Sequence, residues 1–96
     1  MSKSVNVRVT WSQSKLNRTP SSGIYSTLAR FSADTEWPNG DTWSVVLEFD
    51  TAESQHSEFY ARARFLSPVA PMDRLGAGES FDLYEGRKVT AHVTVL

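Results

Sequence analysis

A strict alternation of side chains over residues 43–50 constrains this chain more than any other feature of its sequence. The segment reads WSVVLEFD, with Trp43, Val45, Leu47 and Phe49 in one phase. Successive side chains of a strand point to opposite faces, so this pattern predicts a β-strand with one buried face. The second phase, which includes Val46, is predicted to face outward.

The same period of two recurs along the chain. Residues 5–11 alternate between valines and polar residues and end on Trp11. Comparable segments follow at residues 24–33, 59–66, 80–84 and 88–96. No segment carries the 3.6-residue period of a long amphipathic helix. About six strands joined by turns predict one small all-β domain over residues 1–96, either a barrel or a sandwich. Closure into a barrel would leave no exposed strand edges.

The connections between these segments carry turn residues. Glu85-Gly86-Arg87 separates the last two segments and predicts a tight hairpin with positive φ at its glycine. Residues 12–23 and 51–58 are polar and are predicted to be loops. Asp73-Arg74-Leu75 is expected to form a single helical turn within a long connection that is rich in proline and glycine.

Most of the large aromatic side chains fall in the inward phase. These predicted core residues are Trp11, Trp43, Phe49, Phe59 and Phe65. Trp37 stands apart because it precedes Pro38 in a turn signature, Pro-Asn-Gly. Two interpretations of Trp37 are open. It covers the mouth of a barrel, or it is an exposed anchor for a partner, since tryptophan is enriched among binding hot spots.

Charge is distributed unevenly although the net charge is only −1. Residues 1–32 carry basic side chains and no acidic ones, whereas residues 33–59 carry acidic side chains and no basic ones. The favoured interpretation is that the two blocks neutralise one another across a sheet. The alternative is two faces of opposite sign that steer a partner. The overall balance is unlike that of a dedicated nucleic-acid-binding domain, which is usually basic.

The sequence carries no recognisable catalytic or metal-binding motif. It contains no cysteine, which excludes disulfides and Cys-based zinc sites. His56 falls in a polar loop and His92 on the outward phase of the last strand, so a shared metal would require the fold to bring them together. Gly76-Ala77-Gly78 follows a proline-rich loop and is read as a turn. We therefore expect no catalytic residue, metal, cofactor or small-molecule substrate. With no signal-peptide-like or membrane-spanning segment, a cytoplasmic location is expected.

Arg62 and Arg64 share a strand phase with Tyr60. Arginine beside an aromatic ring can hold a phosphate or stack on a base. The favoured interpretation is instead cross-strand pairing of these arginines with Glu48 and Asp50, which face outward on the preceding strand.

Several short segments together resemble a known domain. They are EGRKVTAHV at residues 85–93, FLSPVAP at 65–71, RTPSSGIY at 18–25 followed by ARF, and the first strand at 5–9. Their order and spacing resemble the third, C-terminal domain of bacterial elongation factor Tu. The resemblance implies a small six-stranded closed antiparallel barrel of Greek-key type. The GTPase domain of that family, with its phosphate-binding loop, is not part of this chain.

The resemblance also implies where contacts to tRNA would lie. Arg18 stands where the family has a basic residue before Thr-Pro, and Glu85-Gly86 matches its hairpin. Leu28 replaces a family glutamine, and Ser67 replaces a lysine. We expect a non-enzymatic module that binds another protein through its oppositely charged segments and Trp37. The alternative is an RNA-binding accessory domain whose contact is lined by Arg18, Arg62, Arg64, Glu85 and Gly86. The candidate contact residues are Arg18, Trp37, Arg62, Arg64, Glu85 and Gly86.

Overall fold

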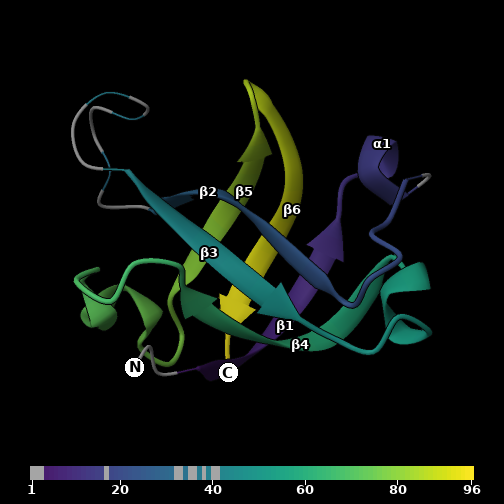
Figure 1. Cartoon of the computed structure of the whole chain (residues 1–96), viewed down its shortest axis with the longest axis horizontal. Coiled ribbons are helices and arrows are strands. Elements are labelled where there is room, and N and C mark those ends of the chain that lie inside the picture. Colours follow the sequence, from purple (N-terminus) through teal and green to yellow (C-terminus); the bar gives the residue numbers. More distant parts are fainter. Residues whose placement is uncertain (1–3, 17, 32–33, 35–36, 38, 40–41) are drawn as a thin grey trace.

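Six antiparallel strands form a closed barrel in the described part of the chain, which comprises residues 4–16, 18–31, 34, 37, 39 and 42–96 of the computed structural model (Figure 1). The strands are β1 (Val5–Trp11), β2 (Ile24–Phe31), β3 (Trp43–Glu48), β4 (Glu58–Phe65), β5 (Ser80–Glu85) and β6 (Lys88–Val95). Their order around the barrel is β1-β4-β3-β2-β5-β6, and β6 pairs with β1. The first strand thus lies beside the fourth, as in a Greek key. The predicted closed all-β barrel is confirmed.

In the described residues, helical structure is confined to single turns in the connections. α1 (Gln13–Leu16) lies within the segment predicted to be a loop, and the 3₁₀ turn η1 (Glu53–Gln55) interrupts the second polar connection. The 3₁₀ turn η2 (Met72–Leu75) confirms the helical turn expected near Asp73. No helix in the described residues has the length and apolar character needed to cross a membrane.

The alternating pattern produces the core. Strand β4 shows the alternation most clearly, with every second side chain from Phe59 to Phe65 buried. Near one end of the barrel, Trp11 packs 5.3 Å from Phe59, and its indole Nε1–H donates to the Ser54 carbonyl at 2.8 Å. In a second aromatic group, the rings of Phe31 and Phe81 lie 4.8 Å apart. Burial of large aromatic rings dominates the energetics of small cores.

The predicted inward aromatics behave as expected, with two of them less buried than the rest. Trp11, Phe59 and Phe65 are buried, whereas Trp43 and Phe49 are half-buried and pack against the core. One prediction was wrong: Val46, assigned to the outward phase, is only 2% exposed. It stands directly beside Arg64 of β4 in the sheet register. An arginine stem covers apolar surface while its charged end stays in water, which explains how an outward valine is shielded.

Strand ends and turns agree closely with the sequence. The second strand ends at Phe31, and residues 32 and 33, which the prediction included, lie outside the described residues. The β5–β6 hairpin turns at Gly86, whose φ is +63° as predicted. A β-bulge lies next to this turn. Leu83 pairs with Ala91 and Tyr84 with Val89, so Thr90 is the extra residue on β6. This bulge turns Thr90 into a buried position beside the hairpin.

Candidate functional site

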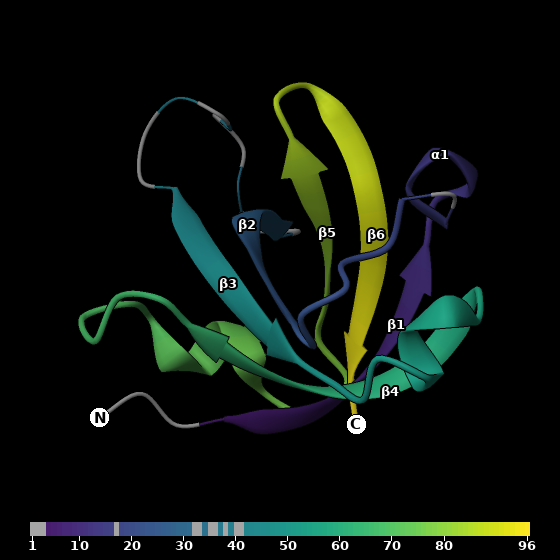
Figure 2. The ribbon, with the colours of Figure 1, turned by 45° about the vertical axis from the view of Figure 1, so that its right-hand side comes forward.

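Four of the six predicted contact residues gather at one end of the barrel. Glu85 and Gly86 form the tip of the β5–β6 hairpin, which Figures 1 and 2 show at the same end as α1. Arg18 is close enough that its charge contributes to lowering the pKa of Glu85. Trp37 lines a hollow together with Gly86. The structure therefore brings these residues near one another.

The other two predicted residues lie elsewhere. Arg62 and Arg64 belong to β4, which pairs with β1 and β3. In the barrel order, two strands separate β4 from β5 in either direction. The RNA contact that joined Arg62 and Arg64 to the hairpin is therefore divided between opposite walls of the barrel.

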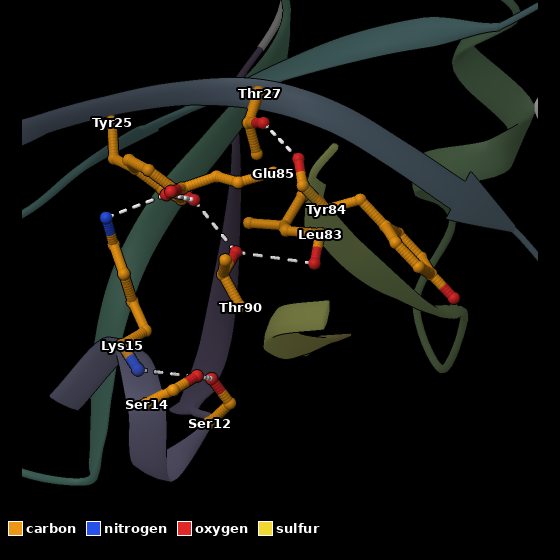
Figure 3. A network of polar contacts seen from close by, with 9 residues as sticks. All are labelled: Ser12, Ser14, Lys15, Tyr25, Thr27, Leu83, Tyr84, Glu85 and Thr90. Atoms are coloured by element: carbon orange, nitrogen blue, oxygen red, sulfur yellow. Dashed lines mark hydrogen bonds and ion pairs between the residues drawn. The ribbon is translucent and has the colours of Figure 1, made fainter. Parts of the chain in front are cut away.

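A polar network fastens the hairpin to α1 (Figure 3). The Glu85 carboxylate lies 2.7 Å from the Lys15 ammonium and accepts a hydrogen bond from the Tyr25 hydroxyl at 2.5 Å. The Tyr25 hydroxyl oxygen also lies 2.8 Å from Thr90 Oγ1. Thr90 in turn donates to the Leu83 carbonyl at 3.3 Å. Three separate segments meet in this network, which gives Glu85 a structural role within the chain.

The network changes the titration of its members. The hydrogen bond from Lys15, and then the one from Tyr25, hold the pKa of Glu85 below its ordinary value. Burial, and then the hydrogen bond to Glu85, raise the pKa of Tyr25 above its ordinary value. Tyr25 therefore remains a neutral donor, and Glu85 remains an ionised acceptor, through the physiological range.

A hollow of about 520 Å³ opens between the loop that carries Trp37 and the tip of the hairpin. Its lining residues are Arg30, Trp37, Asn39, Tyr84, Gly86 and Arg87. Two arginines and two aromatic residues therefore line one open space. The lining contains no acidic side chain from the described residues.

Trp37 forms a wall of this hollow. Its ring centroid lies 4.3 Å from that of Tyr84, and its indole Nε1–H donates to the Ala29 carbonyl at 3.1 Å. The guanidinium of Arg30 lies 5.9 Å from the indole centroid, within the range of a cation–π contact. Trp37 is half-buried. Trp37 therefore packs against residues of β2 and β5.

Two apolar side chains lie on the outer face of the sheet beside Tyr84, which lines the hollow. Leu28 of β2 and Val89 of β6 both pair with Tyr84 of β5, one on each side. Residues directly opposite one another in antiparallel strands share a face. Leu28 is 36% exposed and Val89 is 38% exposed. We call this set the hairpin surface; it comprises Leu28, Arg30, Trp37, Tyr84, Arg87 and Val89.

Sequence reasoning selected only Trp37 from the hairpin surface. A signal for part of the rest existed in the outward phases of the strands. Leu28 is an apolar residue at an outward position, where a solvated face needs none. Val89 gives no such signal, because strict alternation places it in the inward phase with Ala91 and only the β-bulge turns it outward. The contribution of Arg87 depends on how the hairpin tip meets the Trp37 loop, which the sequence does not define.

The opposite wall carries a second exposed group. Tyr60 of β4 is 68% exposed and pairs directly with Arg8 of β1. Arg62 lies two residues farther along the same face, and its guanidinium donates to the Ser4 hydroxyl at 2.8 Å. We call Asn6, Arg8, Tyr60 and Arg62 the β1–β4 face. Arg64 instead forms the predicted ion pair with Glu48, at 3.2 Å.

Among the residues that the structure describes, no ion pair joins the basic block to the acidic block, although the favoured interpretation expects such pairs. The ion pairs made by the acidic block in the described residues use Arg64 and Arg74, which follow that block in the chain. Lys15, from the basic block, pairs with Glu85 near the C-terminus. Neighbouring strands do supply two of the contacts between opposite charges, Arg64–Glu48 and His92–Asp82, but neither joins residues 1–32 to residues 33–59.

The two histidines lie on different elements. His92 is exposed on β6, where its Nδ1 lies 2.7 Å from an Asp82 carboxylate oxygen. His56 is exposed in the turn that precedes β4. Within the described residues, no cluster of three or more histidine, cysteine, aspartate or glutamate side chains could hold a metal ion.

The closed six-stranded antiparallel barrel is compatible with the third domain of elongation factor Tu. No protein-family model, curated protein or solved structure matches the chain.

Proposed function

We propose that this chain is a non-enzymatic, cytoplasmic protein-interaction module and that the hairpin surface is its contact region. The row formed by Leu28, Tyr84 and Val89 carries the proposal, because it places exposed apolar side chains beside the hollow. Arg30 and Arg87 flank this row. Tyrosine, tryptophan and arginine are the residue types enriched at binding hot spots.

The contacts that hold the hairpin surface together support this role. Trp37 is held by a hydrogen bond and by contacts with Tyr84 and Arg30. The Tyr84 carbonyl accepts a hydrogen bond from the Thr27 hydroxyl on the neighbouring strand. A surface that is already ordered loses little conformational entropy when a partner binds, which favours affinity.

The resemblance to elongation factor Tu supports a process related to translation. Arg18 and Glu85-Gly86, the features shared with that family, lie at the same end of the barrel as the hairpin surface. Glu85 is engaged by Lys15 and Tyr25, so it shapes this end more than it offers a free charge. We propose that the partner is a protein of the translation apparatus.

A second candidate function is RNA binding through the β1–β4 face. The observation in its favour is the exposed Tyr60 ring between Arg8, on the paired strand, and Arg62. Single-stranded RNA is bound by aromatic rings that stack on bases and by basic groups that follow the phosphates. This face contains only one such ring, so we rank the function second.

Affinity capture from a lysate of the source organism, with three matched baits, tests the proposal. The baits are the wild type, the hairpin-surface variant Leu28→Lys/Val89→Lys, and the β1–β4 variant Arg8→Glu/Arg62→Glu. All four positions are exposed or partly exposed, and circular dichroism checks that each bait is folded. Retained protein and RNA are both identified at low and high salt.

The proposal expects a protein that the wild type and the β1–β4 variant retain and that the hairpin-surface variant loses. Retained RNA that is released by salt and lost from the β1–β4 variant would establish the second candidate instead, because phosphate contacts weaken steeply with salt. A protein retained equally by all three baits would contradict the assignment of the contact surface.

A further inference from the structure

We infer that the hairpin surface recognises an acidic peptide segment of its partner, with carboxylates bound in the hollow and an apolar side chain placed over Leu28 or Val89. This inference rests on the proposed function and adds the chemistry of the partner. It follows from which groups line the hollow, which groups border it, and which binding modes the closed barrel excludes.

The charged groups of the hollow favour carboxylates. Arg30 and Arg87 both line it, and each guanidinium can form paired hydrogen bonds to a carboxylate. Asp82 of β5 is the acidic residue that stands directly opposite Arg30 of β2 in the sheet register. Asp82 already contacts His92 Nδ1 at 2.7 Å and lines a separate, smaller hollow. Arg30 therefore stands between the two hollows, and Arg87 lines only the larger one.

The border of the hollow favours an apolar neighbour to those carboxylates. Leu28 and Val89 lie on either side of Tyr84, at adjacent strand positions and on the same face. Covering these partly exposed side chains would remove apolar surface from water. An aliphatic or aromatic side chain of the partner, one or two residues from its acids, would reach this position.

The fold excludes one common mode of peptide binding at this surface. Peptides often add a strand to a free sheet edge. Each of the six strands has two neighbours in the closed barrel, so the described residues present no such edge. Recognition must then depend on side chains. At this surface those are the two arginines and the row formed by Leu28, Tyr84 and Val89.

The aromatic rings of the hollow already have partners within the chain. Trp37 is in contact with Tyr84 and with the Arg30 guanidinium. Stacking of a nucleotide on either ring would compete with these contacts. A peptide that binds the arginines and the apolar row would leave the Trp37–Tyr84 contact in place, and for this reason we favour a peptide.

Selection from a library of random linear peptides displayed on phage tests the inference and does not require that the partner be identified. The intact chain is the bait, alongside Arg30→Glu/Arg87→Glu and the control Arg8→Glu/Arg62→Glu, each checked for folding by circular dichroism. The wild type and the control should enrich peptides with aspartate or glutamate next to an aliphatic or aromatic residue. The charge-reversed bait should lose these peptides and enrich lysine or arginine.

An isolated peptide then gives a quantitative check by titration. Arg30→Gln/Arg87→Gln should weaken binding by about tenfold or more, the size expected when charge-assisted hydrogen bonds are lost. In the ¹H–¹⁵N spectrum, the Trp37 indole signal should shift on binding, and the buried Trp11 signal should not. A short oligouridylate that displaces the peptide would overturn the inference, since the hollow would then accept a nucleic acid.

The outcomes separate the inference from the proposed function. Peptides without acidic residues, whose binding nevertheless depends on Leu28 and Val89, would refute the inference and leave the interaction surface standing. Peptides that bind equally well to Leu28→Lys/Val89→Lys and to the charge-reversed bait would refute both. Failure to enrich any peptide would refute the inference, and the lysate capture would still decide the proposed function.

Discussion

The indole ring of Trp37 and the phenol ring of Tyr84 lie 4.3 Å apart, centroid to centroid. This contact joins the connection between β2 and β3 to strand β5, although the two residues are far apart in the sequence. It also fixes one wall of the hollow beside the hairpin tip. The hairpin surface therefore depends on a contact between segments that local sequence patterns do not relate.

Substitutions of Trp37 should separate its hydrogen bond from its ring contact. Trp37→Phe keeps an aromatic ring beside Tyr84 and loses only the donor to Ala29, so it should cost about 1 kcal/mol in the free energy of unfolding. Trp37→Ala also removes the ring contact and should cost about 1 kcal/mol more. Urea unfolding followed by far-ultraviolet circular dichroism measures both. Equal losses would show that the ring contact does not contribute.

Two arginine ion pairs in different environments should differ in their contribution to stability. Arg74 Nη1 lies 2.9 Å from Asp34, whose side chain is 9% exposed, whereas Arg64 pairs with Glu48, which is 53% exposed. Arg74→Met would leave a buried carboxylate with fewer partners and should cost about 1–3 kcal/mol. Arg64→Met should change stability by about 0.5 kcal/mol or less. Denaturant unfolding of the two variants and the wild type measures both losses in the free energy of unfolding. A larger loss for Arg64→Met than for Arg74→Met would contradict the prediction.

The polar network around Glu85 should make the free energy of unfolding depend on pH. The pKa of Glu85 is lowered in the folded chain from its ordinary value of 4.5, first by Lys15 and then by Tyr25. The stabilisation is therefore fully present above about pH 4.5 and is lost as pH falls through the lower, folded pKa.

The matched variants for this test are Glu85→Gln and Lys15→Met. In the wild type, the midpoint of urea unfolding should fall more steeply below pH 4.5 than in Glu85→Gln, which cannot titrate at this position. Lys15→Met should give an intermediate slope, because Tyr25 still donates to the carboxylate. Identical slopes for the wild type and Glu85→Gln would show that the network does not couple to folding.

Three glycines at positive φ should respond differently to alanine. Gly23, Gly78 and Gly86 have φ of +76°, +87° and +63°. A Cβ on Gly23 would lie 2.9 Å from the Phe49 carbonyl oxygen, whereas a Cβ on Gly78 or Gly86 would meet nothing within 4 Å. Gly78→Ala and Gly86→Ala should each cost about 1–2 kcal/mol from backbone strain alone. Gly23→Ala should cost clearly more, because the Phe49 backbone must also move. Thermal unfolding of the three variants measures these costs. An equal loss of stability in all three would show that the close contact at Gly23 is unimportant.

The strands could be predicted because their information is local. The alternation from Val5 to Trp11 and from Phe59 to Phe65 fixes both the strands and their inward faces. Val46 shows the limit of this reasoning, since its burial depends on the neighbouring Arg64. Closure between β1 and β6 depends on pairing of the chain ends, for which no single segment carries a signal.

The candidate site could be predicted only in part. Gly86 and Glu85 were selected from a hairpin motif, and their positions are local consequences of that motif. Leu28 and Val89 become one surface only because β2 and β6 both pair with β5. Arg62 was grouped with the hairpin from sequence, yet two strands separate β4 from β5 in the barrel order. Strand order, and not residue type, determines which side chains share a surface.

Site-specific photo-cross-linking in cells of the source organism tests the central claim most directly. A photoreactive benzoylphenylalanine replaces Val89 on the hairpin surface in one strain and Arg62 on the β1–β4 face in another. If the hairpin surface is the contact region, a protein is cross-linked from position 89 and none from position 62. Cross-links to protein or RNA from position 62, with none from position 89, would contradict this assignment.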